Sequence, residues 1–129
     1  MSRPGIRLIA ETPGSGDVIK RQRIYQVRLR LWLNRGEAVR WDQPWGMIER
    51  ARLEEDGATL VTDLRYDREN LFAGLFQGID GMRIGGKRKL KIASHLAYGD
   101  AGIPGKIPPR AAITAEIEII EERNRDPST

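Results

Sequence analysis

Hydrophobic and polar residues alternate along three stretches of this chain. From Ile24 to Leu33, apolar residues alternate with arginines and a tryptophan. The same period of two covers residues 87–92, where three lysines alternate with Arg88, Leu90 and Ile92, and residues 113–120, where polar residues alternate with apolar ones. Successive side chains of a strand point to opposite faces, so each stretch predicts a strand with one buried face. We expect Lys–Glu pairs between the last two strands on their polar faces.

Weaker patterns predict the remaining strands and one helix. The strands cover residues 6–11, 37–41 and 59–66, and turns rich in Gly, Pro, Asn and Asp cover residues 12–17, 34–36, 44–46 and 54–57. Between Leu71 and Ile79 the apolar residues recur at helical spacing. We expect Asn70 to cap this helix, Gly81 to end it, and its apolar face to pack on the concave side of the sheet.

Length and composition indicate one domain without a cofactor. The 129 residues are enough to bury a core without disulfides, and we expect a single domain over 1–122 with a disordered tail over 123–129. The chain has no cysteine and one histidine, His95. Neither a disulfide framework nor a metal site built from thiolates or histidines is therefore expected.

Charge and hydropathy narrow the class of partner. The net charge is +4 and the sequence pI is about 9.8. Because the 18 acidic residues are interspersed with the basic ones, a solvated surface is favoured over a nucleic-acid partner. No apolar run approaches the ~18 residues that a membrane span needs. We expect a cytoplasmic monomer with no membrane contact.

Three motifs between Phe72 and Ile120 carry a family resemblance. Gly-Met-x-x-Gly-x-x-x-x-Leu-x-Ile begins at Gly81, Ala-Tyr-Gly covers 97–99, and Gly-Ile-Pro-Gly-x-Ile-Pro-Pro covers 102–109. Together they resemble the C-terminal half of the FKBP family of peptidyl-prolyl cis-trans isomerases. The resemblance implies an α+β fold, in which an antiparallel sheet of about five strands curls around one short helix.

The resemblance also implies an extra hairpin before the helix, because residues 42–67 exceed the usual crossing from strand to helix. Insertions in surface loops cost little, so decoration is favoured over a new binding element. Trp45 keeps the second interpretation open.

The implied activity needs no nucleophile and no metal. Rotation about a peptide bond has a barrier of ~18–20 kcal/mol, while the two isomers before proline differ by only about 1 kcal/mol. An apolar slot and a few hydrogen bonds that favour the twisted amide are sufficient. The expected ligands are proline-containing peptides or unfolded proteins, and the macrolides that the family binds, the latter weakly.

The site residues follow from the resemblance, position by position. The tyrosine hydroxyl belongs to Tyr98, the backbone donor is the N–H of Phe72, and the loop isoleucine is Ile107. Mostly aliphatic residues stand where the family usually has rings, and an arginine replaces an aspartate. These substrate-binding positions are Leu29, Val39, Arg40, Leu71, Leu75 and Ala115. We expect a wider slot with weak or altered activity, and a preference of Arg40 for an acidic residue beside the proline.

Other interpretations stay open at this point. A non-catalytic FKBP-like module that binds peptides or proteins fits the loss of rings, and a basic nucleic-acid binder ranks last. Tyr98 is interpreted as a ligand-binding residue in preference to a packing tyrosine. We expect its side chain and that of Ile107 to turn toward the helix from an exposed loop over 99–109. Trp41 and Trp45 either replace the lost ring area or pack the hairpin.

Overall fold

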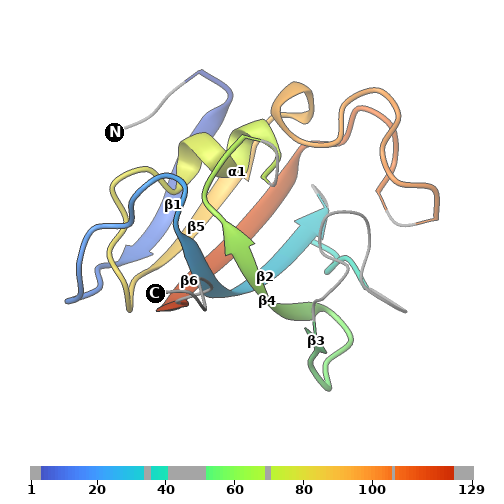
Figure 1. The fold of residues 1–129 in the computed structure, drawn as a ribbon. Helices are drawn as coiled ribbons and strands as arrows, with labels where there is room; N and C mark the ends of the chain where they lie inside the picture. The colour runs from blue at the N-terminus through green and yellow to red at the C-terminus, as the bar shows by residue number, and fades with distance from the viewer. Residues whose placement is uncertain (1–3, 34–35, 41–51, 69–70, 106, 124–129) are drawn as a thin grey trace.

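The computed structural model describes residues 4–33, 36–40, 52–68, 71–105 and 107–123. Within them, six strands form one antiparallel sheet and a short helix lies across it, which confirms the α+β class (Figure 1). The strands are β1 (Ile6–Thr12), β2 (Ile24–Leu33), β3 (Arg52–Leu53), β4 (Thr59–Arg65), β5 (Lys87–Ile92) and β6 (Ile113–Arg123). The helix is α1 (Ala73–Gly78), and a 3₁₀ turn, η2 (Ser94–Leu96), follows β5. Their order in the sheet is β1-β5-β6-β2-β4-β3, so β6 lies near the middle.

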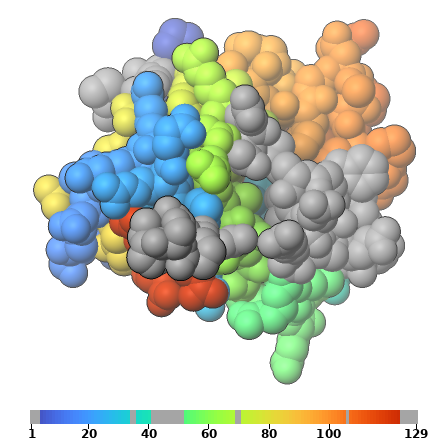
Figure 2. Space-filling model, viewed as in Figure 1, coloured from blue at the N-terminus to red at the C-terminus, as the bar shows by residue number. Residues whose placement is uncertain are grey.

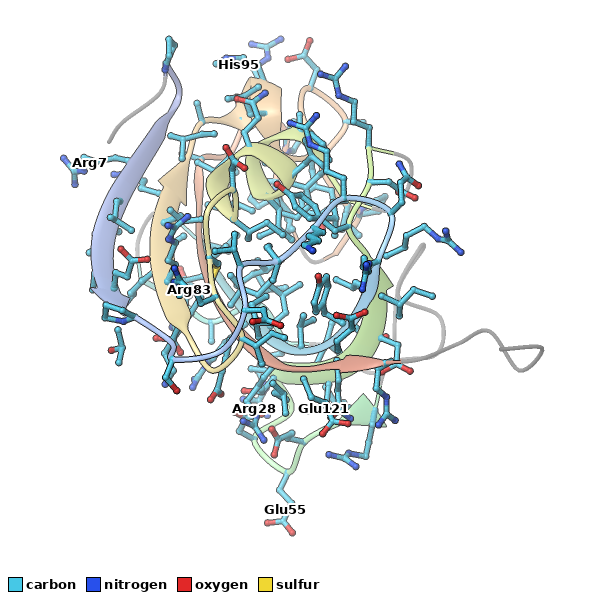
Figure 3. The ribbon with its side chains drawn as sticks, turned by 60° about the vertical axis from the view of Figure 1, so that its left-hand side comes forward. Arg7, Arg28, Glu55, Arg83, His95 and Glu121 are labelled. Carbon is cyan, nitrogen blue, oxygen red and sulfur yellow. The ribbon has the colours of Figure 1, made fainter. Side chains whose placement is uncertain are left out.

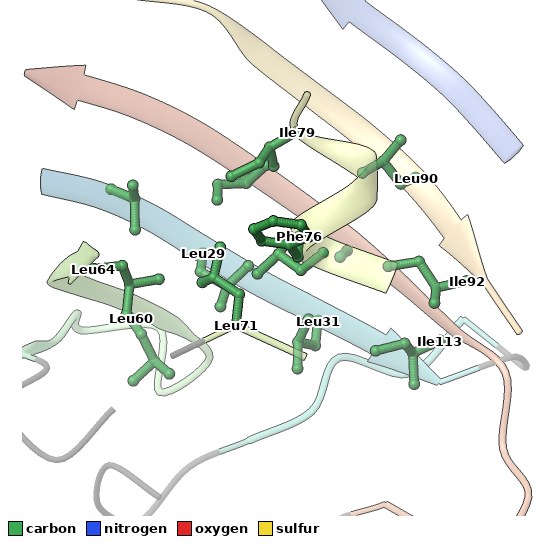
Figure 4. Close-up of a cluster of buried hydrophobic side chains, with 14 of the residues drawn as sticks. Leu29, Leu31, Leu60, Leu64, Leu71, Phe76, Ile79, Leu90, Ile92 and Ile113 are labelled. Atoms are coloured by element: carbon green, nitrogen blue, oxygen red, sulfur yellow. The ribbon is translucent and has the colours of Figure 1, made fainter. Parts of the chain in front are cut away.

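The core lies between α1 and one face of the sheet. On β2, the side chains of Leu29 and Leu31 are buried and the intervening ones are not, as the period of two predicted. Their neighbours on β6 follow the same rule, with Leu29 opposite Ile117 and Leu31 opposite Ala115. Figure 4 shows Phe76 of α1 above this surface. Burial of these apolar faces, at roughly 25 cal/mol per Å², is the main term that holds the helix on the sheet.

The opposite face of the sheet carries its charges. The register places Lys87 opposite Glu118 and Lys89 opposite Glu116, the cross-strand arrangement predicted from the pattern. Arg28 projects from this face in Figure 3 and donates to Glu54 at 2.7 Å and to Glu118 at 2.8 Å. The second bond ties β2 to β6 and the first ties β2 to the β3–β4 hairpin.

The hairpin before the helix is present and belongs to the sheet. The carboxylate of Asp56 accepts hydrogen bonds from the Thr59 hydroxyl at 2.6 Å and from the N–H groups of Thr59 and Ala58 at 2.9 Å. These bonds lower the pKa of Asp56 to about 2. β4 pairs with β2 along its whole length, from Thr59 to Arg65. The sheet therefore has six strands where about five were expected; the turn at 44–46 lies outside the described residues.

The return strand predicted over 37–41 is reduced to one bridge. Trp32 pairs with Ala38, and the N–H of Val39 donates to the carbonyl of Leu31 at 2.8 Å. The segment after Gly36 pairs with β2 through this single bridge, so it does not form a further strand. Trp41 lies outside the described residues.

The helix is shorter than predicted at both ends. Phe72 is its N-cap, with an extended backbone (φ −65°, ψ 154°) and no side-chain cap, and Ile79 is its C-cap. Gly81 lies in the following turn at φ +84°. The predicted cap, Asn70, lies outside the described residues. At the C-terminal end of the chain, β6 includes Arg123, the first residue of the predicted tail.

Candidate functional site

The start of α1 and the segment after η2 meet at two aromatic rings. The ring centroids of Phe72 and Tyr98 lie 5.2 Å apart at an interplanar angle of 46°. Such tilted contacts are favourable for aromatic pairs. The expected contact between these residues is therefore present, and it joins the helix to the loop that follows β5.

The hydroxyl of Tyr98 lies in apolar surroundings. Burial raises the pKa of Tyr98 to about 12, and no other cause contributes. Among the described residues none forms a hydrogen bond with this hydroxyl. Burial of this kind disfavours the charged form of the group. The group therefore stays protonated at neutral pH and can donate to an acceptor brought by a ligand.

The backbone of Phe72 supplies a second donor beside the ring contact. The carbonyl of Phe72 accepts the first intrahelical bond, from the N–H of Phe76 at 2.9 Å. As the N-cap, Phe72 precedes every N–H that the helix uses internally. Its own N–H is thus not consumed by the helix, as the expected role requires.

The loop after Tyr98 is closed by two isoleucines. Ile103 and Ile107 exchange both backbone hydrogen bonds at 2.8 Å, and both side chains are buried. Gly102 lies at φ +61°, where a Cβ would meet the carbonyl of Ile107 at 2.2 Å, so this position requires glycine. The described prolines of the loop are exposed. Ile107 therefore points into the protein from an exposed loop, as expected.

Ile103 was not predicted as a site residue. It is 1% exposed and pairs with Ile107, which was predicted. The repeat of Ile-Pro at a spacing of four residues was the available signal, because the two halves of the loop are related by this pairing.

The aliphatic positions of the predicted slot are packed into the core. Their side chains are at most 3% exposed and belong to the main hydrophobic cluster; two of them, Leu29 and Leu71, are labelled in Figure 4. The positions are Leu29, Val39, Leu71, Leu75 and Ala115. They offer a ligand little free surface, and their assignment to substrate binding stays a prediction.

Arg40 is not half-buried beside the slot, as the sequence had suggested. Its side chain is exposed, and its guanidinium lies against Gly57 in the β3–β4 turn. The absence of a Cβ on Gly57 makes room for it. The hairpin thus draws Arg40 away from the role of an unpartnered buried cation.

The described residues contain no group of three or more His, Cys, Asp or Glu side chains placed to hold a metal ion. None of the helices in this part of the chain is long and apolar enough to cross a membrane.

Comparison with known proteins identifies relatives by sequence. A family model described as FKBP-type peptidyl-prolyl cis-trans isomerase matches residues 52–120. The chain is 47% identical over 68 residues to the peptidyl-prolyl cis-trans isomerase FPR2 of Saccharomyces cerevisiae, covering 53% of this chain and 49% of that protein. It is 38% identical over 77 residues to FK506-binding protein 2 of Candida glabrata, covering 54% and 57%. The chain thus spans about half the length of these curated relatives.

Solved structures agree with the fold. The crystal structure of AtFKBP13 superposes with a TM-score of 0.70 at 26% identity, covering 95% of this chain and 96% of that one. FkpA from Escherichia coli superposes with a TM-score of 0.65 at 26% identity, covering 94% and 48%. Because the family model covers more than half of the chain and the fold agrees over nearly all of it, this chain belongs to the FKBP-type peptidyl-prolyl cis-trans isomerase family.

Proposed function

We propose that this protein is a peptidyl-prolyl cis-trans isomerase that acts on proline-containing polypeptides and assists protein folding. The observation that carries the proposal is the hydroxyl of Tyr98, which is desolvated, without a partner among the described residues, and in ring contact with Phe72. The family description and the name of the Saccharomyces cerevisiae relative support the same activity.

The chemistry follows from what twisting does to an amide. In the planar ground state, resonance places negative charge on the carbonyl oxygen, and water stabilises it. Halfway through rotation this resonance is lost, so a site with little water favours the twisted form over the planar one. The proline ring lies against Phe72 and Tyr98 in this proposal, where the apolar surface replaces water.

The two donors then hold the substrate during rotation. The Tyr98 hydroxyl donates to a carbonyl of the substrate, and the N–H of Phe72 donates to a second carbonyl, which fixes the chain on both sides of the rotating bond. No proton is transferred, in keeping with a hydroxyl whose pKa is about 12. Each bond lowers the barrier only as far as it is stronger in the twisted state.

A second candidate is a module that binds such peptides without catalysis. The buried state of Leu75 and Ala115 favours it, because these side chains leave little free surface on which a proline ring can stack. For the same reason we expect weak turnover from an active enzyme. We also expect macrolide binding to be weaker by about ten- to hundredfold than in a slot with full aromatic walls, for a loss of about 1–3 kcal/mol of ring contact.

A cis-trans exchange assay on Ala-Leu-Pro-Phe peptides separates the two. We expect the wild-type chain to accelerate exchange, and Tyr98→Phe to reduce the acceleration by about 2–10-fold, the value of one hydrogen bond. Tyr66→Phe, which removes a hydroxyl that takes no part in the contact between Tyr98 and Phe72, is the matched control and should leave the exchange rate unchanged. Binding without any acceleration by the wild type would select the non-catalytic module.

We also propose that this protein is located in the cytoplasm and is a monomer. Fractionation of cells and sedimentation equilibrium test these two proposals directly.

A further inference from the structure

A cavity beside α1 is lined by two arginines and one phenylalanine. It has a volume of about 280 Å³ and is lined by Arg21, Gln22, Asp67, Arg68 and Phe76. In Figure 2 the blue segment of the turn at 20–23 lies beside the yellow-green segment that leads into α1 on this face. None of these residues contributes to the contact between Tyr98 and Phe72.

Two guanidinium groups share one aromatic ring at this cavity. The Cζ atom of Arg21 lies 5.3 Å from the ring centroid of Phe76, and that of Arg68 lies 5.6 Å from it. Stacking occupies the flat face of a guanidinium and leaves the N–H groups at its edge free to bind an anion. No ion pair to either arginine is found within the described part of the chain. Arg21 also interacts with the Tyr66 hydroxyl, a contact that opposes the rise that burial causes in the pKa of that group. Both cations are thus held in place, and each keeps further N–H groups for a ligand.

The backbone that presents Arg21 is held in a strained conformation. Gln22 has φ +71°, which costs a non-glycine residue roughly 1–2 kcal/mol. Its N–H donates to the carbonyl of Tyr66 at 2.9 Å, and the Tyr66 ring lies 5.2 Å from that of Phe76. This bond fastens the turn to the end of β4. A strained backbone that positions one side chain over a ring is a reason to look for function at that ring.

The acidic groups nearby are already engaged. Asp67 lines the cavity, and its Oδ2 lies 3.9 Å from Nε of Arg65. Asp80 accepts a hydrogen bond from the Tyr66 hydroxyl at 3.4 Å. An incoming carboxylate therefore meets Arg21 and Arg68, with Asp67 as the one acid in the cavity wall.

The N-cap and first turns of α1 connect the Tyr98 contact, at Phe72, with the cavity, at Phe76. Phe76 follows the N-cap Phe72 by four residues, which places its Cα about 6 Å further along the helix axis. An extended polypeptide advances about 3.3 Å per residue. A chain whose proline contacts Phe72 therefore reaches the cavity within roughly two to four residues.

We propose that the cavity formed by Arg21, Arg68 and Phe76 binds an anionic side chain of the substrate polypeptide, two to four residues from the proline that occupies the site at Phe72 and Tyr98. The proposal deepens the proposed function and rests on it. A preference for acidic substrates was expected from Arg40. The proposal assigns this preference to Arg21 and Arg68, which the fold brings together at Phe76. A carboxylate of Glu or Asp and a phosphorylated serine share the required chemistry.

The experiment measures binding and exchange with matched peptides. Calorimetry at low and high salt compares Leu-Pro peptides that carry Glu, Gln or phosphoserine two, three or four residues from the proline. We expect the best Glu peptide to bind about three- to tenfold more tightly than its Gln counterpart at low salt, with the gap shrinking as salt is added. Arg21→Gln and Arg68→Gln together should remove the gap and leave the Gln peptide unaffected. Arg7→Gln, an exposed arginine on β1, and Arg40→Gln should leave the gap intact.

Each outcome decides the matter. A gap that persists in the double variant, or that disappears in Arg40→Gln, overturns the proposal, and so does equal binding of the Glu, Gln and phosphoserine peptides. A gap for phosphoserine alone assigns the cavity to phosphorylated chains. Exchange of the Gln peptide is recorded in parallel: if none occurs, the isomerase activity fails, while the binding data still test the cavity. Amide shifts of Gln22 and Phe76 in a titration with a proline-free Glu peptide show whether the anion alone is bound there.

Discussion

Replacing Tyr98 by phenylalanine should stabilise the protein while impairing it. The variant keeps the ring contact with Phe72 and removes only a hydroxyl that has no partner among the described residues. Burying such a group completely costs about 1–3 kcal/mol in proteins, and the hydroxyl of Tyr98 is not among the fully buried polar atoms that lack a partner. Because the Tyr98 residue is only partly buried, we expect the low end, an increase of about 1 kcal/mol in the free energy of unfolding.

Tyr25→Phe is the matched control with the opposite sign. The hydroxyl of Tyr25 accepts a hydrogen bond from the N–H of Lys20 at 2.8 Å, and the side chain is buried. Its removal leaves that N–H without its partner, so the free energy of unfolding should fall by about 1 kcal/mol. Two chemically identical substitutions are thus expected to move stability in opposite directions.

A sharper test is how the difference in the free energy of unfolding between wild type and Tyr98→Phe depends on pH. Burial raises the pKa of Tyr98 from 10.0 to about 12, so between these values the unfolded chain has released a proton that the folded chain still holds. The contribution of Tyr98 to the free energy of unfolding is therefore fully present below pH 10. It falls by about 1.4 kcal/mol per pH unit as the pH rises toward 12. The variant lacks this loss, while the raised pKa values of Tyr25 and Tyr66 affect both proteins alike.

Urea unfolding at pH 8 to 12 measures the stability change in Tyr98→Phe, the stability change in Tyr25→Phe, and the pH dependence of the first. The variant should be more stable by about 1 kcal/mol at pH 8, and its advantage should grow by up to about 2–3 kcal/mol at pH 12. The same variant should lose about 2–10-fold in kcat/KM. A variant that is less stable than wild type, or a gap that does not change with pH, would show that the hydroxyl has a partner in the folded protein, and the proposed substrate donor would then be wrong.

Further substitutions test the framework around the site. Gly74→Ala should lower stability by about 1–3 kcal/mol, although alanine is the better helix former, because its Cβ would meet Cγ2 of Ile92 at 2.3 Å; thermal unfolding checks the sign. Gln22→Gly should raise the free energy of unfolding by up to about 1 kcal/mol in urea, since glycine adopts the positive φ without strain; unchanged stability would contradict strain at this turn. Arg88→Gln should cost about 2–3 kcal/mol, because it removes charged hydrogen bonds to the carbonyls of Gly78 and Asp80 at 2.8 and 2.7 Å, and amide exchange should rise first at the end of α1.

The sequence predicted those parts of the fold that depend on local periodicity. The bounds of β2 were correct at both ends, because ten residues of strict alternation leave only one register in which the apolar side chains are buried. The segment after Gly36 was predicted as a strand and is a single bridge, since pairing beyond Ala38 depends on what its neighbours do. β4 was predicted as an element, but its place beside β2 was not, because pairing partners far apart in sequence leave no local trace.

The candidate site shows the same division. The contact between Tyr98 and Phe72 was expected because motifs on either side of β5 resemble those of one family. The position of Arg40 against the hairpin turn was not foreseen, because it depends on how the chain crosses after β2. The gathering of Arg21 and Arg68 at Phe76 joins three segments, and only tertiary packing brings such residues together.

The place of β6 in the sheet determines when this protein can acquire its structure during synthesis. β6 is the last strand in the described part of the chain, yet it pairs with β5 on one side and β2 on the other, and it buries Ile113 and Ile117 completely. A nascent chain on the ribosome therefore exposes the apolar faces of β2 and β5 until residue 123 has emerged from the exit tunnel. Pairings such as Tyr25 with Glu122 close very long loops, which makes folding slow. A protein proposed to help other chains fold thus passes through a long unprotected interval of its own.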